Sequence, residues 1–392
     1  MTQGNIYMDF NATTPPDPGL REVLDQWLGQ WGNPSSIHQH GRGPKKILRD
    51  SRRTLAEFLN CHPLELIFTS GGSESNNLAI KGSLAALKSI HPHKDKVIFG
   101  AIEHPSVMAQ KEYLQKIGYE VVTIPVDRFG QYDLNFYKQI IDERVALVSV
   151  MLANNEVGVL APIKEMVSIA HSVGAYFHSD CVQALGKINF RLKDLGVDLA
   201  SFSGHKVYAL KGCGLLFCNK GTPLEPQILG GAQERHRRAG TENVLAVASL
   251  AWSIAQLKTD QLYEQMKGLR DSLEAQLVEK IEGVEIFAQN QKRLPNTTSL
   301  CIAGVSGEAM MMNLDIRGFS VGTGAACSSG NPEPSPVLLA MGIPRAKAQS
   351  SLRITIGKMT TDQQINDFVR NLVEVVSHLR NLQPSGEVRR GI

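Results

Sequence analysis

The sequence predicts an α/β protein with a mostly parallel, seven-stranded sheet in a large domain and a smaller α+β domain beside it. From about residue 64, short runs rich in β-branched and aromatic residues alternate with segments of helical spacing. Such alternation is typical of βαβ units, whose parallel sheets carry helices on both faces. The runs are also apolar throughout rather than at every second position, as expected for strands buried on both faces.

Seven of these runs are expected to form the sheet. They are Leu64–Thr69, Lys96–Ala101, Tyr119–Ile124, Val145–Met151, Ala175–Ser179, Val197–Ser203 and Gly214–Cys218. Between them, apolar residues recur at helical spacing, as at Ile163, Met166, Val167 and Ala170. The segments between the strands are therefore expected to supply helices on the faces of the sheet.

The pattern changes after Gly240. Residues 243–284 are predicted as one long helix, followed by short strands near 299–302 and 353–356 and a closing helix over 361–380. We therefore expect a large cofactor domain of residues 16–257. Residues 1–15 and 258–392 are expected to form the small domain.

Composition excludes several classes of protein. The 392 residues include 41 Lys+Arg and 38 Asp+Glu, and the resulting net charge of +3 is too small to indicate a nucleic-acid or membrane partner. The longest apolar stretch, Leu245–Leu257, is shorter than the roughly 20 residues of a membrane span. Six scattered cysteines without a CxxC pair, and no secretory signal, predict a cytoplasmic protein with reduced thiols. The histidines show no zinc-binding spacing, so we predict no metal.

The first candidate binding motif is Ser70-Gly71-Gly72-Ser73-Glu74-Ser75, which joins a predicted strand to a predicted helix. Glycines at such a turn let backbone N–H groups approach an anion, and the N-terminus of a helix favours negative charge. Ser73 could add a hydroxyl donor. The motif could equally be an ordinary helix cap, and it is not a Walker sequence.

Two further residues follow predicted strands. Asp180 lies where α/β sheets bind ligands, although it could also cap the next helix. Lys206 closes the run Ser203-Gly204-His205-Lys206 and precedes apolar residues, which would lower its pKa and make a nucleophilic amine; alone, it could also be a surface lysine. Together, a phosphate cradle, an acid for a ring nitrogen and a Schiff-base lysine are what pyridoxal phosphate requires of a protein.

The order and spacing of these groups resemble the cysteine desulfurases of the NifS/IscS type, which are class-V aminotransferases and pyridoxal-phosphate enzymes of fold type I. The resemblance runs over nearly the whole chain. Besides the motifs above, it includes Asp9–Pro15, Gly32–Ser36, Glu103-His104, Asn154–Gly158, Asp180–Gln183, Arg238–Asn243, Gly324–Ser329 and Ser351–Arg353.

The resemblance implies a role for each matching residue. Lys206 would form the Schiff base with pyridoxal phosphate, Asp180 would pair with its pyridine nitrogen, and Gln183 would hydrogen-bond its phenolic oxygen. His104 would stack over the ring and move protons. The phosphate would be held by Gly72, Ser73, Ser203 and His205. Asn155 would contact the cofactor and the substrate, whose carboxylate Arg353 would bind in a bidentate manner.

Cys327 is the residue that would decide the reaction. It lies in Val321–Pro332, a run of glycine and small residues that suits a mobile loop of the small domain, whereas the other five cysteines fit core packing. By resemblance, Cys327 would take sulfur from L-cysteine as a persulfide and leave L-alanine. The alternatives are a cystine or selenocysteine lyase, or an aminotransferase of the same fold, and these need no catalytic cysteine.

The resemblance also implies partners. In this family the position of Thr241 reaches the phosphate of the neighbouring subunit, which implies a homodimer with shared active sites. The persulfide sulfur would pass to an acceptor protein for iron–sulfur cluster or thio-cofactor biosynthesis. The sequence leaves the identity of that acceptor open.

Overall fold

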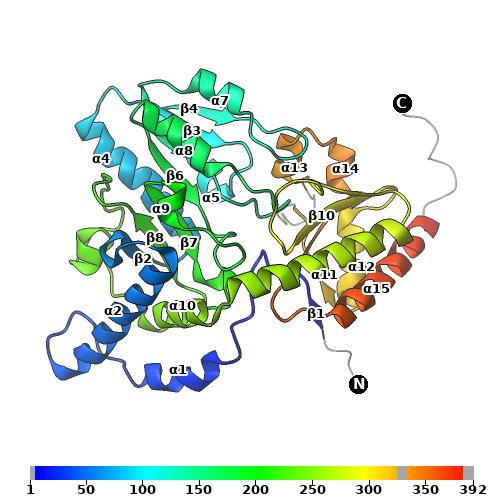
Figure 1. Cartoon of the computed structure of the whole chain (residues 1–392), viewed down its shortest axis with the longest axis horizontal. Helices are drawn as coiled ribbons and strands as arrows, with labels where there is room; N and C mark the ends of the chain where they lie inside the picture. The colour runs from blue at the N-terminus through cyan, green and yellow to red at the C-terminus, as the bar shows by residue number, and fades with distance from the viewer. Residues whose placement is uncertain (1–4, 325–332, 383–392) are drawn as a thin grey trace.

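The computed structural model describes residues 5–324 and 333–382. Among these residues, the largest sheet has seven strands in the order β2-β8-β7-β6-β5-β3-β4 (Figure 1). Strand β8 alone runs in the direction opposite to the other six strands of that sheet, so the mostly parallel sheet is confirmed. The strands are β2 (Leu66–Thr69), β3 (Lys96–Gly100), β4 (Glu120–Ile124), β5 (Val145–Ser149), β6 (Tyr176–Asp180), β7 (Leu199–Ser203) and β8 (Gly214–Cys218).

The sheet is buried on both faces, which explains why its strands do not alternate between apolar and polar residues. In β8, Leu215 and Phe217 pack into one apolar cluster, while Leu216 and Cys218 pack into another. All five residues of β8 are buried. Successive side chains of a strand point to opposite faces, so both faces select apolar residues.

Helices surround this sheet in Figure 1. Helix α8 buries Ile163, Met166, Val167 and Ala170, as its spacing predicts. Helix α3 continues into α4 through a π-helical turn at Leu78–Gly82. The helices are α1 (Leu20–Leu28), α2 (Gln39–Leu59), α3 (Gly72–Asn77), α4 (Ser83–Ile90), α5 (Pro105–Met108), α6 (Gln110–Lys116), α7 (Leu134–Ile140), α8 (Ile163–Ser172), α9 (Leu192–Leu195) and α10 (Val244–Gln256).

The prediction of one helix over residues 243–284 is wrong. The chain forms α10 and then α11 (Thr259–Lys280), with Leu257 in an extended conformation between them. No proline or glycine marks the break. Leu257 packs against two apolar clusters, one beneath the large sheet and one that α11 helps to form. The helix therefore ends where the chain passes from one core to the next.

The second cluster belongs to an α+β region built from both ends of the described chain. It joins Met8 to apolar residues of α11 and α15, and Figure 1 shows β1 among the C-terminal elements. The strands are β1 (Ile6–Tyr7), β9 (Val284–Ile286), β10 (Thr297–Ile302), β11 (Phe319–Ser320) and β12 (Ser351–Thr355). The helices are α12 (Gly307–Ile316), α13 (Pro336–Ala340), α14 (Arg345–Gln349) and α15 (Asp362–Asn381).

Strand β10 lies between β12 and β9 in an antiparallel sheet, and β1 pairs with β11 in parallel. This region matches the expected small α+β part of the fold. The domain boundaries at residues 15 and 257 stay a prediction. In the described part of the chain, no helix has the length and apolar character needed to cross a membrane.

Candidate active site

The candidate site lies where the parallel strands of the large sheet end. Strand β6 ends at Asp180, β7 leads into Lys206, and β2 leads into Gly72 at the start of α3. A cavity of about 300 Å³ opens at this edge, the place where α/β sheets bind ligands. It brings together ten predicted site residues: Gly72, Ser73, His104, Asn155, Asp180, Gln183, Ser203, His205, Lys206 and Arg353.

Two predicted site residues are not in this group. Thr241 is exposed and does not line the cavity of its own chain. Cys327 lies outside the described residues. Their roles therefore stay predictions. Within residues 5–324 and 333–382, no group of three or more His, Cys, Asp or Glu side chains is arranged to hold a metal ion.

The Lys206 amine lies on the cavity wall. Its Nζ donates hydrogen bonds to the carbonyl oxygens of Asn11, at 2.6 Å, and Ala12, at 2.5 Å. Burial, together with the positive charge of Arg353, lowers the pKa of Lys206 to about 8, although two nearby carboxylates oppose this shift. A substantial fraction of the amine is therefore neutral near pH 8, as a nucleophile requires.

This pKa predicts how the cofactor-free protein responds to pH. The rate at which it bonds to added pyridoxal phosphate is expected to rise with pH and to level off above about 8. Only the neutral amine attacks an aldehyde, and an unperturbed lysine would be under about 1 % neutral at that pH. Stopped-flow absorbance between pH 6 and 10 measures this profile. A rate that still climbs tenfold per unit above pH 9 would contradict the prediction.

The Asp180 carboxylate is held by two donors. Its Oδ2 accepts a hydrogen bond from Asn76 Nδ2 at 2.8 Å, and its Oδ1 accepts one from the backbone N–H of Val182 at 2.9 Å. Asp180 thus caps a turn that follows β6, rather than the start of a helix, and also lines the cavity. A fixed, largely buried carboxylate in this place can keep a ring nitrogen protonated.

His104 begins α5 as its cap. Its Nδ1 accepts a hydrogen bond from the backbone N–H of Ser106 at 3.1 Å and lies 2.8 Å from the hydroxyl of the same residue. Burial lowers the pKa of His104, although Asp180 opposes the shift. The lowered pKa favours the neutral imidazole, and because Nδ1 accepts a hydrogen bond, the proton of that form lies on Nε2, where it can donate a hydrogen bond to a ligand.

The phosphate end of the cavity fits an anion. The hydroxyl of Ser203 is buried and has no hydrogen-bond partner. A Cβ atom on Gly72 would lie 2.9 Å from Val182 Cγ2, so only glycine lets the backbone approach here. The free donor and the open backbone suit the phosphate of pyridoxal phosphate. With Lys206 and Asp180 in the same cavity, the residues fit this cofactor.

Arg353 also lines the cavity and is anchored by two contacts. Its Nη2 forms an ion pair with Asp9 Oδ1 at 2.8 Å, and its Nη1 donates to the carbonyl oxygen of Asn155 at 3.3 Å. Its Nε is buried without a partner. The contacts with Asp9 and Asn155 use two of the five guanidinium N–H groups, so the side chain keeps donors for an anionic group, as the predicted contact with a substrate carboxylate requires.

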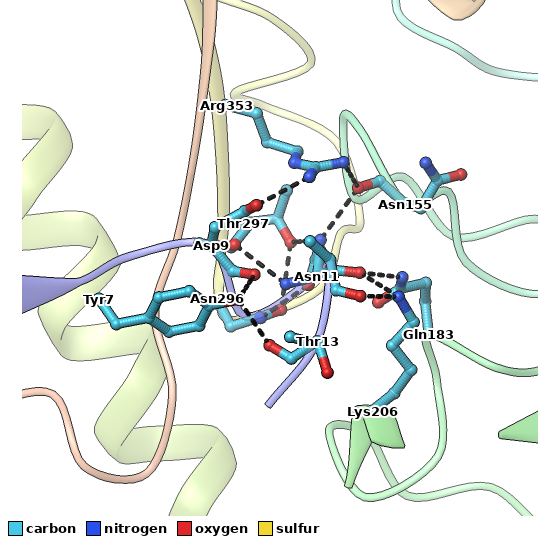
Figure 2. A network of polar contacts seen from close by, with 12 residues as sticks. Tyr7, Asp9, Asn11, Thr13, Asn155, Gln183, Lys206, Asn296, Thr297 and Arg353 are labelled. Atoms are coloured by element: carbon cyan, nitrogen blue, oxygen red, sulfur yellow. Dashed lines mark hydrogen bonds and ion pairs between the residues drawn. The ribbon is translucent and has the colours of Figure 1, made fainter. Parts of the chain in front are cut away.

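Several residues of the cavity were not predicted from the sequence, above all Asn11. Figure 2 shows its backbone oxygen between Lys206 and Gln183. Its Nδ2 donates to the carbonyl oxygen of Asn155 at 3.1 Å and to Thr297 Oγ1 at 2.9 Å. The only hint in the sequence was its place in the motif Asp9–Pro15. The other missed lining residues are Ala12, Asn76, Ser106, Met151 and Val182.

Comparisons with known proteins agree with this geometry. The sequence pattern of the aminotransferase class-V family matches residues 6–368. The chain is 39% identical over 382 residues to the cysteine desulfurase IscS of Dictyoglomus turgidum, covering 97% of this chain and 96% of the relative. It is 38% identical over 386 residues to the cysteine desulfurase NifS of Azotobacter vinelandii, covering 97% and 94%.

Solved structures give the same result. A NifS-like protein superimposes with a TM-score of 0.88 at 33% identity, covering 95% of this chain and all of that one. The NifS-like protein of Rickettsia africae gives a TM-score of 0.84 at 33% identity, covering 95% and 99%. The chain therefore belongs to the aminotransferase class-V family and, within it, to the cysteine desulfurases of the NifS/IscS type. These are fold-type I enzymes that use pyridoxal phosphate.

Proposed function

We propose that this enzyme converts L-cysteine to L-alanine, places the sulfur on Cys327 as a persulfide and passes it to an acceptor protein. The observation that carries the proposal is one cavity that holds the Lys206 amine, the Asp180 carboxylate and the Arg353 guanidinium. The curated relatives named cysteine desulfurase support the same reaction.

Each residue of the site has its own role in the proposed reaction. Bound pyridoxal phosphate supplies an electron sink for charge at the substrate α-carbon. Lys206 moves the proton at that carbon, and Asp180 keeps the ring nitrogen protonated. Arg353 and Asn155 hold the substrate carboxylate. His104 moves the proton at the substrate sulfur.

The sulfur-transfer step requires no added oxidant. The Cys327 thiolate attacks the substrate sulfur, so an S–S bond forms while the C–S bond breaks. The electron pair of the C–S bond stays on carbon, which takes up a proton and becomes the methyl group of alanine. A reductant or an acceptor protein then removes the sulfane sulfur and restores the thiol.

The other cysteines support Cys327 as the sulfur carrier. In each, burial is the main cause of a raised thiol pKa, so the reactive thiolate is disfavoured. The pKa rises to about 11 in Cys218 and Cys301 and to about 12 in Cys61 and Cys213, and it is raised in Cys181 as well. None of these five side chains lines the cavity among the described residues.

We further propose a cytoplasmic homodimer with shared active sites, in which Thr241 reaches the cofactor of the partner subunit. Its exposure outside the cavity of its own chain supports this arrangement. The exposed apolar side chains of Trp31, Ile37 and Leu229 suit a subunit interface. The acceptor protein would serve iron–sulfur cluster or thio-cofactor biosynthesis.

A product assay tests the proposed reaction. Holoenzyme incubated with L-cysteine and excess dithiothreitol is expected to release alanine and sulfide in equal amounts, because each desulfuration leaves one molecule of each. Chromatography of derivatised amino acids and a colorimetric sulfide assay measure the two products. L-Serine, which has no sulfur to transfer, should yield no alanine. Pyruvate and ammonia in place of alanine would instead identify a lyase and overturn the proposal.

A further inference from the structure

A buried lysine beside the cavity has no part in the mechanism above. Lys187 lies in the turns that follow β6, four residues after Gln183, and is only 6% exposed. Its Nζ lies 2.5 Å from Gln183 Oε1 and 3.0 Å from Asn11 Oδ1. Both contacts join the amine to the oxygen of a carboxamide.

These contacts fix which way each carboxamide points. An amide has an oxygen on one side and an NH₂ group on the other, and an ammonium group can only donate. Burial is the main cause that lowers the pKa of Lys187 well below its usual value. The neutral amine still has two N–H donors, which is enough for both bonds. Either form of Lys187 therefore supplies a donor to each oxygen.

The consequence for Gln183 is specific. With Oε1 turned toward Lys187, its Nε2 donates to the carbonyl oxygen of Asn11 at 3.0 Å, next to the bond from Lys206. Gln183 also lines the cavity. The group that it can offer to a ligand is thus an N–H donor rather than an oxygen acceptor.

Asn11 is oriented in the same way. Its Oδ1 accepts from Lys187 and from Asn296 Nδ2, the latter at 3.0 Å, so two donors hold the oxygen on this side. Its Nδ2 is left to donate to the carbonyl oxygen of Asn155. One buried amine thereby sets the orientation of two side-chain amides, those of Gln183 and Asn11, which border the cavity.

We propose that Lys187 is a positioning residue, which holds the Gln183 amide with its N–H group toward the phenolic oxygen of the cofactor. The inference rests on the proposed placement of pyridoxal phosphate in this cavity. An N–H donor at that oxygen stabilises its anionic form. Lys187 therefore helps to set the pH at which the bound cofactor gains or loses its proton, without touching the cofactor.

Lys94 provides a matched control. It is also a buried lysine, but its Nζ donates to three backbone carbonyl oxygens, those of Glu143, Val145 and Val173. Lys94 thus stabilises the backbone and orients no side-chain amide. Replacement of Lys94 by methionine should therefore reproduce the cost of losing a buried lysine and leave the cofactor unaffected.

The test is a pH titration of the visible absorption band of holoenzyme without substrate. Lys187→Met is expected to raise the midpoint by about one pH unit, the scale of one lost hydrogen bond to a charged group. Lys94→Met should leave the midpoint unchanged. An unchanged midpoint in Lys187→Met, or an equal shift in both variants, would overturn the proposal. Because no substrate is present, a failure here is distinct from a failure of the proposed desulfuration.

A second variant keeps the test decisive if Lys187→Met does not fold. Gln183→Leu removes the amide and leaves Lys187 in place, so a lost N–H donor should also raise the midpoint. A lower or unchanged midpoint would mean that the amide does not present its N–H group, and would refute the proposed orientation. Where both variants fold, the double variant should titrate like Gln183→Leu alone. A further rise in the double variant would mean that Lys187 acts independently of Gln183.

Discussion

Replacement of Lys206 by alanine is expected to lower the rate of alanine formation from L-cysteine by at least about a thousandfold. The change removes the amine that we propose bonds to the cofactor and moves the proton at the α-carbon. The structure holds this amine against the carbonyl oxygens of Asn11 and Ala12, and no other lysine lines the cavity among the described residues. Steady-state assays of alanine at saturating cofactor measure the loss.

Two control variants distinguish the loss of the Lys206 amine from the mere loss of a positive charge. Lys206→Arg keeps a cation but cannot bond to an aldehyde, so it should be as inactive as Lys206→Ala. Lys211→Ala, at an exposed lysine outside the cavity, should behave like the unmodified enzyme. Borohydride reduction followed by peptide mapping should attach the cofactor to Lys206. Attachment at another lysine, or more than a tenth of the activity in Lys206→Ala, would refute the assignment.

Replacement of Cys327 by serine is expected to abolish persulfide formation from L-cysteine while the cofactor stays bound with its normal absorption spectrum. A serine hydroxyl has the size of the thiol but cannot carry sulfane sulfur. The five other thiols have raised pKa values caused mainly by burial, so they should not take over. Mass spectrometry of the protein after one turnover detects the mass of the added sulfur atom.

The control for this prediction is Cys61→Ser. Cys61 is the least buried of the described cysteines, yet it lies beyond the end of α2 and not in the cavity. This variant should load sulfur at the normal rate. Normal loading in Cys327→Ser would mean that another thiol is the carrier, and a lost spectrum would mean that Cys327 is needed for cofactor binding.

The large sheet could be predicted because its strands are buried on both faces. A run such as Gly214–Cys218 needs apolar side chains at every position, and β8 has the predicted ends. The break between α10 and α11 could not be predicted, because Leu257 leaves the helix to reach two cores. A tertiary contact decided that conformation, and local propensity gave no hint of it.

The same limit applies to the candidate site. Lys206 and Asp180 could be predicted because they follow strands and match a motif. Asn11 and Lys187 were missed, since Asn11 lies far from both of its partners in the sequence: it precedes Gln183 by 172 residues and Lys187 by 176 residues. Asn155 and Arg353 could be named only through the family resemblance, because a single arginine or asparagine does not by itself indicate a site.

The position of Asn11 also bears on how the enzyme matures. Its backbone N–H donates to Thr355 Oγ1, 344 residues further along the chain, and its carbonyl oxygen orients the Lys206 amine. Contacts of such long range form late, because the intervening chain must first be made and folded. A nascent chain still on the ribosome, ending before β12, lacks the partner that anchors Asn11. We therefore expect the site to be completed only once β12, which also carries Arg353, has been synthesised and has folded.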